Sequence, residues 1–285
     1  MISIVLCSYH GGCYIQQQRD SILRQKAAEE FRLYEYDDVI RQSGSATLNF
    51  LSAINEVPKA DFYMLSDQDD VWHDDKIEKL THFIRENDTG SPLLAFSDAV
   101  VVDDDLNKIS DSFVKYQRIS PDRVSFNPLL LQNQVTGAAC IFNNALRDIL
   151  LAHQIPKHAA VHDHWIALVA SAFGRIIYLD EPLYDYRQHN HNLLGAQKAG
   201  VIKEASARMT PSGSDRSAAG YKALFAQAEE FLEIFGDELT YEQIDACRHF
   251  ISLPDLKKAE RIKTILKYGF TYNNAYRTLG EMIFI

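Results

Sequence analysis

The sequence predicts an α/β protein with a mostly parallel central sheet, followed by a helical region at the carboxyl end. Over the first two-thirds of the 285 residues, short apolar runs alternate with segments of helical periodicity, which is the pattern of an α/β domain. The first run, residues 2–7, is rich in apolar and β-branched side chains and is typical of a strand buried on both faces. From residue 219 onward, apolar residues recur at helical spacing.

Each element is predicted from the spacing of its apolar residues. The expected strands are residues 2–7, 31–36, 62–65, 93–96, 99–102, 137–142 and 175–179. The expected helices are residues 14–25, 48–54, 76–85, 144–153 and 164–173, and later 221–235, 241–250 and 257–268. A stretch rich in Ser, Pro and Gly at 209–218 indicates a linker. We therefore expect a domain at 1–195, a linker at 196–218 and a helical region at 219–285.

Composition and charge narrow the class of protein. The chain is 46% hydrophobic and 24% charged, which is ordinary for a globular protein whose core needs no disulfides. The formal net charge of −10 argues against nucleic acid as a partner. The four cysteines are scattered, the amino-terminal run lacks basic residues, and no apolar run approaches the roughly 20 residues of a membrane span. These features predict a cytoplasmic protein.

An acidic motif directly follows the third expected strand. Asp67, Asp69 and Asp70 make up this motif with Gln68, and Asp38 stands at the end of the second expected strand. Ligands bind beyond the carboxyl ends of the strands in parallel sheets, so these carboxylates should share one edge. Carboxylate oxygens suit Mg²⁺ or Mn²⁺, and phosphate oxygens of a leaving diphosphate can complete the shell. The residues alone leave both a cation site and a solvated acidic turn open.

Ordered motifs run through the first two-thirds of the chain. They are C-S-Y-H-G at 7–11, D-S-I-L-R-Q at 20–25, S-D-Q-D-D-V-W at 66–72, F-S-D at 96–98, V-T-G-A-A at 135–139, H-D-H-W-I-A-L at 162–168 and Y-R-Q-H-N at 186–190. In this order and spacing they resemble the family 2 glycosyltransferases, most closely the rhamnosyltransferase-like branch. The resemblance covers residues 2–194 and is weak beyond them.

The resemblance implies a GT-A fold and transfer of a sugar such as rhamnose, with inversion, from a nucleoside-diphosphate donor to a hydroxyl of a surface glycan. The acceptor would be a glycan or a lipid-linked glycan. The nucleotide would be lined by Ser8, Tyr9, Asp38 and Asp67. Asp67 and Asp69 would hold the diphosphate through Mn²⁺ or Mg²⁺, with His189 over the diphosphate or in the metal shell.

The resemblance also implies a catalytic base at Asp163. An inverting transfer needs a base on the face opposite the leaving group, within hydrogen-bond reach of the acceptor hydroxyl. Asp163 is equally placed to cap the helix expected from residue 164, and both roles can hold together.

Three further positions are expected at the sugars. Trp72 would stack on a sugar ring or pack in the core. Asp98 would contact the acceptor. Gly137 would let a sugar approach closely or make a tight backbone contact.

The chain departs from the family pattern after Asp38. The family continues from this position into a helix and a further strand, whereas here residues 39–51 lead almost at once into the next helix. The shortening would leave the second strand as a sheet edge and remove one wall beside the nucleotide base. A degenerate module that binds a sugar or a protein partner without catalysis is therefore the alternative. A sugar nucleotidyltransferase is disfavoured because residues 8–15 contain no Lys or Arg.

The carboxyl-terminal region contains one basic amphipathic stretch. Lys and Arg residues between 257 and 267 surround Ile262, Ile265 and Leu266. Such a helix can pack on the domain or lie on an anionic membrane surface, which would suit a lipid-linked acceptor. In the second case the protein would be peripheral on the inner face of the membrane.

Overall fold

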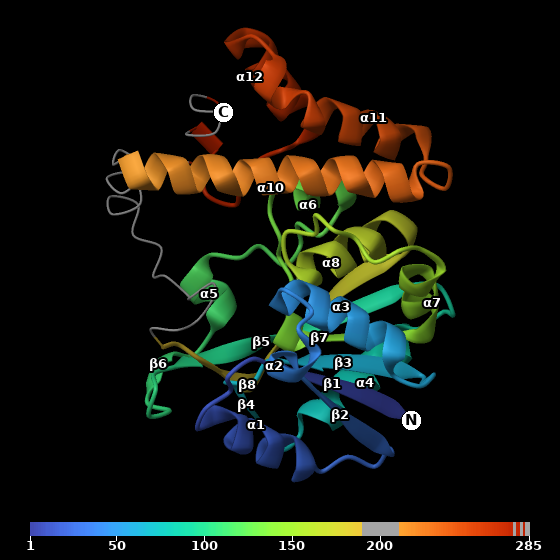
Figure 1. Ribbon diagram of the computed structural model, residues 1–285, viewed down its shortest axis with the longest axis vertical. Coiled ribbons are helices and arrows are strands. Elements are labelled where there is room, and N and C mark those ends of the chain that lie inside the picture. Colours follow the sequence, from blue (N-terminus) through green and yellow to red (C-terminus); the bar gives the residue numbers. More distant parts are fainter. Residues whose placement is uncertain (190–210, 276–277, 280–281, 283–285) are drawn as a thin grey trace.

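The computed structural model describes residues 1–189, 211–275, 278–279 and 282, and it shows an α/β domain beneath a layer of helices (Figure 1). The strands are β1 (Ile2–Ser8), β2 (Phe31–Asp37), β3 (Phe62–Ser66), β4 (Val71–Trp72), β5 (Leu93–Val102), β6 (Lys108–Ser110), β7 (Cys140–Asn143) and β8 (Arg175–Arg187). The helices before β8 are α1 (Tyr14–Leu23), α2 (Asp38–Arg41), α3 (Ala46–Glu56), α4 (Lys76–Asn87), α5 (Phe113–Gln117), α6 (Phe126–Leu131), η1 (Gly137–Ala139), α7 (Asn144–Ala152) and α8 (His162–Phe173). The later helices are α10 (Pro211–Phe235), α11 (Tyr241–Ile251), η2 (Leu253–Asp255) and α12 (Lys258–Tyr268).

The described strands form one sheet in the order β2–β1–β3–β7–β5–β8–β4, with β6 paired to β5. β1 lies parallel to both β2 and β3, and β5 lies parallel to β8. β7 runs antiparallel to both β3 and β5, so β2, β1, β3, β5 and β8 all point the same way. The α/β class and the mostly parallel sheet expected from the sequence are confirmed.

The second strand is an edge of this sheet, as the shortened sequence after Asp38 predicts. Among the described strands β2 pairs with β1 alone, and much of its surface is exposed, whereas every residue of β1 except Ser8 is buried. The chain returns from β2 to β3 through α2 and α3. The hydroxyl of Ser45 caps α3 by accepting the N–H of Leu48 at 3.1 Å. One crossover of this kind is enough to place β3 parallel to β1 on its other side.

Several boundaries differ from those expected. Residues 93–96 and 99–102 form the single strand β5, whose register with β8 shifts near Asp98. Residues 137–139 form the turn η1, so only Cys140–Asn143 is a strand. β8 continues past residue 179 to Arg187. The short elements β4, β6, α2, α5 and α6 have 2 to 6 residues, too few to show a period in the sequence.

The helical layer packs over α6 and α8 (Figure 1). Phe231 and Phe235 of α10 contact Trp165 of α8, with ring centroids 5.4 and 6.1 Å apart. α10 begins at Pro211, inside the stretch expected to be a linker, and proline suits a first helical position because its missing N–H needs no partner there. Residues 196–210 of that expected linker lie outside the described residues.

Polar side chains of α10 hold the loop that leads into α8. Glu230 accepts the N–H groups of Lys157 and His158 at 2.8 and 2.6 Å. Gln227 accepts the N–H of Ala160 at 2.8 Å. Both α10 side chains are buried, so these bonds satisfy main-chain donors at a place shielded from water. The helical layer therefore positions the start of α8.

The last long helix, α12, lies at the outer end of the layer (Figure 1). Ile265 is fully buried, so one face of α12 packs against the protein. Lys263 and Lys267 are exposed on the opposite face, Lys258 is exposed at the start of the helix, and Leu266 is 62% exposed. Within the described part of the chain, we find no helix with the length and apolar character needed to cross a membrane.

Candidate active site

The carboxyl ends of three neighbouring strands define one edge of the sheet. β1 ends at Ser8, which lies in register with Asp37 at the end of β2, and β3 ends at Ser66. Asp38 and Asp67 are the next residues after β2 and β3. The structure therefore brings these carboxylates to a common edge, because strands that run in the same direction also end on the same side.

The residues assigned to the nucleotide lie along this edge. Tyr9 is 59% exposed and presents a flat ring at the surface. Its N–H donates to Oε1 of Gln68 at 2.8 Å, which ties the loop after β1 to the acidic loop after β3. Asp38 is buried, and its Oδ1 accepts the N–H of Ser43 at 2.8 Å.

Asp67 shares its surroundings with ionisable groups from distant parts of the chain. Burial is the main cause that raises its pKa to about 7; the charges of Asp69 and Asp163 also raise it, whereas that of Lys76 lowers it. The pKa of Asp70 is likewise raised, by burial and by the other two carboxylates of the loop. The charge of Asp163 in α8 therefore affects the pKa of a residue in the acidic loop after β3.

Asp69 and His189, both assigned to the cation by resemblance, are in direct contact. Oδ2 of Asp69 lies 2.8 Å from Nε2 of His189, and the two side chains are 17% and 6% exposed. The ring of His189 stacks on Tyr14, with centroids 5.0 Å apart. Arg187 clamps the same loop, since its Nε donates to the carbonyl of Asp69 at 2.8 Å and its N–H donates to Oδ1 of Asp70 at 3.2 Å.

This donor set suits a divalent cation but is incomplete by itself. In residues 1–189 and the described later helices, no group of three or more His, Cys, Asp and Glu side chains is arranged to hold a metal ion. Asp69 and His189 supply one oxygen and one nitrogen donor, and Oδ2 of Asp70 is buried without a hydrogen-bond partner. A cation would offset the repulsion among these carboxylates, and ligand oxygens would have to complete its shell.

Asp163 lies in the first turn of α8 with both carboxylate oxygens bound by donors. Oδ1 accepts from the side chain of Asn133 at 3.0 Å and from the N–H of His164 at 2.7 Å, while Oδ2 accepts the N–H of Gly137 at 3.0 Å. The helix already begins at His162, so Asp163 is inside the first turn rather than at the cap. Burial raises its pKa to about 6, although the N–H donors act in the opposite direction. Such a carboxylate is suited to accept a proton near neutral pH.

The tight contact expected at Gly137 is made with a histidine. A side chain at Gly137 would collide with the ring of His162. That ring is buried and stacks on Phe50 of α3, with centroids 4.0 Å apart. Burial lowers the pKa of His162 to about 3, so the ring is neutral. The η1 turn and the first turn of α8 are therefore packed directly against each other.

Two residues expected at the sugars make contacts within the fold. Trp72 is 0% exposed and packs in the core, with Nζ of Lys76 3.7 Å from its ring centroid. Asp98 is buried, and its carboxylate accepts the N–H of Val114 at 2.9 Å and the hydroxyl of Ser112. These contacts organise the start of α5. Of the two roles expected for Trp72, the structure shows core packing. The assignment of Asp98 to the acceptor stays a prediction.

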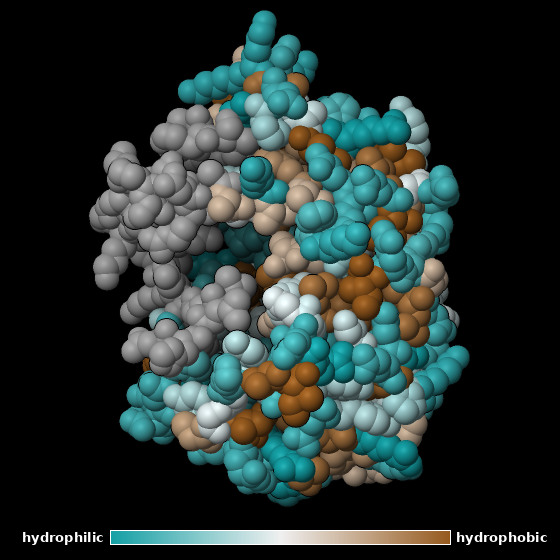
Figure 2. Space-filling view, in the orientation of Figure 1, coloured by the Kyte–Doolittle hydropathy of each residue, from teal (hydrophilic) through white to brown (hydrophobic). Residues whose placement is uncertain are grey.

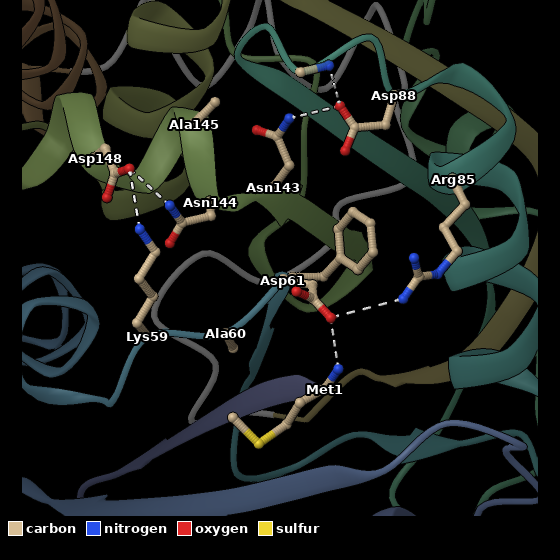
Figure 3. A pocket seen from close by; sticks show the side chains of 12 residues that line it. Met1, Lys59, Ala60, Asp61, Arg85, Asp88, Asn143, Asn144, Ala145 and Asp148 are labelled. Carbon is tan, nitrogen blue, oxygen red and sulfur yellow. Dashed lines mark hydrogen bonds and ion pairs between the residues drawn. The ribbon is translucent and has the colours of Figure 1, made fainter.

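A cavity of about 590 Å³ lies at the opposite end of the sheet, beside the starts of β1 and β3 (Figure 3). Its charged groups pair with one another. Asp61 accepts from the amino group of Met1 at 2.7 Å and lies 3.8 Å from Arg85. Lys59 lies 3.9 Å from Asp148. Because these charges are already matched and lie at the wrong end of the strands, this cavity is not a candidate for the diphosphate.

A second cavity, of about 330 Å³, lies between the domain and the helical layer. Gln132 and Asn133 line one side, and Tyr221 and Tyr272 line another. The surface is hollowed below α10 on the face that Figure 2 shows, with hydrophilic side chains in its depth. Since Asn133 also donates to Asp163, this cavity adjoins the carboxylate assigned as the base.

Comparison with known proteins identifies the class. No family model matches the chain. Over 233 residues it is 26% identical to the dTDP-rhamnosyl transferase RfbG of Shigella flexneri, which spans 67% of this chain and 74% of that relative. The fold matches the crystal structure of S. aureus TarS 1–349 with a TM-score of 0.52 and 15% identity, over 99% of this chain and 80% of the other. The chain has the GT-A fold of glycosyltransferases and is similar in sequence to a rhamnosyl transferase.

The comparisons confirm the resemblance to the rhamnosyltransferase-like glycosyltransferases that the ordered motifs indicate. TarS in complex with UDP-GlcNAc matches with a TM-score of 0.54 and 15% identity, over 94% of this chain and 80% of the other. Sequence reasoning did not single out four residues that contact the candidate site or its supporting turns, namely Lys76, Asn133, His162 and Arg187. Lys76 carried a visible signal, since it heads an expected helix whose apolar face includes the buried Ile77, Leu80 and Ile84.

Proposed function

We propose that the protein is an inverting glycosyltransferase that moves a sugar from a nucleoside-diphosphate donor to a hydroxyl of a growing glycan. One observation carries the proposal. Burial, Asp69 and, after them, Asp163 of α8 raise the pKa of Asp67, so the carboxylate proposed as the base lies close enough to act on the acidic loop. Convergence of these carboxylates around one strand edge is the arrangement that the chemistry requires.

The donor would lie across the carboxyl ends of β1 and β2. The nucleotide would be lined by Ser8, Tyr9, Asp38 and Asp67. The name of the dTDP-rhamnosyl transferase relative makes dTDP-rhamnose the first donor to test. UDP-GlcNAc, bound in one TarS structure, is the second.

A divalent cation, Mn²⁺ or Mg²⁺, would be held by Asp67, Asp69 and His189 together with diphosphate oxygens. When bound, such an ion neutralises negative charge that develops on the leaving diphosphate. The contact between Asp69 and His189 supports this assignment, as does the crowding of carboxylates in the loop. Arg187 keeps the loop in place by binding its main chain.

Asp163 would act as the base. A carboxylate has about four acceptor positions, and three donors already occupy this one, which leaves a position for the acceptor hydroxyl. The hydroxyl oxygen forms a bond to the anomeric carbon as the bond from that carbon to the diphosphate oxygen breaks. The hydroxyl proton passes to Asp163, and attack opposite the leaving group inverts the configuration.

The acceptor would enter through the cavity between the domain and the helical layer, which adjoins Asp163 through Asn133. A glycan or lipid-linked glycan fits a cavity lined by both tyrosine rings and amide side chains. The exposed lysines of α12 and the exposed Leu266 would rest on an anionic membrane surface. That contact would bring the cavity near an acceptor carried by a lipid.

Donor turnover tests the proposal. The purified protein is incubated with Mn²⁺ and a panel of nucleotide sugars that includes dTDP-rhamnose and UDP-GlcNAc, and released nucleoside diphosphate is measured. We expect turnover of at least one donor, its loss in Asp69→Ala, and its retention in Asp111→Ala. Asp111 is a matched control because its side chain is 84% exposed and forms an ion pair with Lys108.

The open edge at β2 favours one alternative, a degenerate module that binds a sugar or protein partner without catalysis. A missing wall beside the nucleotide base would lower donor affinity while leaving the fold intact. Calorimetric titration with the same donors and Mn²⁺ separates the two functions. Binding of no donor would select the module, whereas binding together with turnover selects the enzyme.

A further inference from the structure

A lysine is buried beneath the acidic loop. Lys76, the first residue of α4, is 0% exposed, and its Nζ lies 3.7 Å from the ring centroid of Trp72 and 4.4 Å from that of Tyr184. Burial lowers its pKa to about 7, while the charges of Asp70 and Asp67 act in the opposite direction. Contacts with two aromatic faces replace only part of the hydration that a buried ammonium loses.

The ammonium binds the main chain of the turn that holds the base. Nζ of Lys76 donates to the carbonyl of Ala138 at 2.5 Å. Ala138 is the middle residue of η1, and the preceding residue, Gly137, donates its N–H to Oδ2 of Asp163. Lys76 therefore binds the residue next to the one whose N–H donates to Asp163.

Stability alone does not account for a charge at this place. Replacing a buried ionic group with an apolar side chain of similar volume is often neutral or stabilising. A methionine at position 76 would fill much of the same space between Trp72 and Tyr184 without the desolvation of an ammonium. The lysine supplies two things that a methionine would lack, a positive charge beside Asp70 and Asp67 and a donor to the carbonyl of Ala138.

We propose that Lys76 is a positioning residue, which holds the carbonyl of Ala138 and thereby sets the Gly137 N–H that orients Asp163. This inference rests on the proposed function, in which Asp163 is the base of the transfer. Because the Gly137 N–H favours the ionised carboxylate, a displaced turn makes Asp163 harder to ionise.

A titration without substrate tests the inference independently of activity. Aspartate side chains are labelled with ¹³C, and the signal of Asp163 is assigned by its loss in Asp163→Asn. The pKa of Asp163 is then measured by NMR in the wild type, in Lys76→Met and in Lys79→Met. Lys79 is a matched control, since it lies on the same helix, is 43% exposed, and forms ion pairs with Asp75 and Glu181.

We expect the pKa of Asp163 to rise above about 6 in Lys76→Met and to stay unchanged in Lys79→Met. The neighbouring His162 and His164 do not interfere, because burial lowers their pKa values to about 3 and about 4 and keeps them neutral over this range. Asp67, which faces Asp163, is followed in the same spectra. An unchanged pKa of Asp163 in folded Lys76→Met overturns the inference.

Turnover at saturating Mn²⁺ supplies the second test. We expect Lys76→Met to lower kcat by about 10- to 100-fold and to move the acid side of the pH profile upward. A fall in kcat without that movement would show a structural role only and overturn the inference. Lys76→Gln is measured in the same way if the methionine variant does not fold. If the wild type turns over no donor, the proposed function fails, and the NMR titration still decides the role of Lys76.

Discussion

Nε2 of His162 lies 2.5 Å from the place that a Cβ would occupy on Gly137, closer than real Cβ atoms approach a neighbour. The two residues stand in different sequence motifs, one in the η1 turn and the other at the start of α8. Both segments donate hydrogen bonds to Asp163. The glycine is therefore required by the packing of the groups that hold the carboxylate.

Gly137→Ala should destabilise the protein by about 1–3 kcal/mol, because the new methyl group must displace the ring of His162 or the turn itself. Urea unfolding measures the loss. The double variant Gly137→Ala with His162→Ala removes the obstructing ring and should recover part of the stability that the single variants lose. Strictly additive losses in this double-mutant cycle would mean that the two residues do not act on each other.

Asp163→Asn should abolish transfer while donor binding persists. Removing a general base costs about 10²- to 10⁴-fold in rate, and none of the residues assigned to the nucleotide contacts this side chain. The amide would also turn N–H groups toward one of the present donors, which costs roughly 1–3 kcal/mol of stability. Calorimetry measures donor binding and product analysis measures transfer, with Asp111→Asn as the exposed control. Undiminished transfer by the folded variant would exclude Asp163 from the mechanism.

The rate of transfer should fall on the acid side near pH 6. The pKa of Asp163 is raised to about 6, so the carboxyl group is ionised and basic above this pH and protonated below it. With a base of this kind, kcat/KM drops roughly tenfold for each pH unit below the pKa. The profile is recorded at saturating Mn²⁺, which keeps the acidic loop ionised. An acid limb near the ordinary carboxyl value of about 4 would contradict the assignment.

His189→Ala should weaken the affinity for Mn²⁺ in the presence of donor by at least about tenfold. The expected cause is loss of a nitrogen donor next to Asp69, since Nε2 and Oδ2 lie 2.8 Å apart. Electron paramagnetic resonance measures free Mn²⁺ during the titration. His82→Ala is the control, because His82 is 74% exposed on α4. Equal affinities in the wild type and His189→Ala would remove His189 from the cation shell.

Charge reversal on α12 should release the protein from anionic vesicles. Each lysine near an anionic surface contributes about 1 kcal/mol, so a triple variant of Lys258, Lys263 and Lys267 to Glu should lose nearly all binding. Sedimentation with vesicles of phosphatidylglycerol and phosphatidylcholine measures this, and pure phosphatidylcholine is the control. Donor turnover in solution should not change. Equal sedimentation of wild type and variant would show that this face does not contact membranes.

The strand-end carboxylates are the part of the site that sequence reasoning reaches most directly. Asp38 and Asp67 follow strands of one parallel sheet, and the geometry of such sheets brings them to one edge. The edge position of β2 could also be predicted from the sequence, because the chain after Asp38 is shorter than the family pattern. Asp163 is different, because nothing in its local pattern shows which loop the start of α8 faces. Only the resemblance connects it to the acidic loop.

The remaining positions depend on tertiary packing that no short pattern encodes. Trp72 directly follows the acidic residues in sequence, yet it is fully buried and packs against Lys76 of α4. Asp98 follows an apolar run as the other strand-end carboxylates do, but the strand continues past it and the carboxylate binds the start of α5 instead. The sequence predicts a strand at the turn η1, because its small apolar residues are compatible with both a strand and a short helical turn.

Glu230 and Gln227 bind the loop before α8, so the helical layer supports the helix that carries the proposed base. A protein truncated after β8 would leave three main-chain N–H donors in this loop without their acceptors. It would also remove Phe231 from the ring of Trp165, which lies in the same helix as Asp163. In the proposed mechanism, exchanging this layer to alter acceptor preference would therefore also displace Asp163. The helical layer and the loop before α8 should therefore be exchanged together in any chimaeric protein.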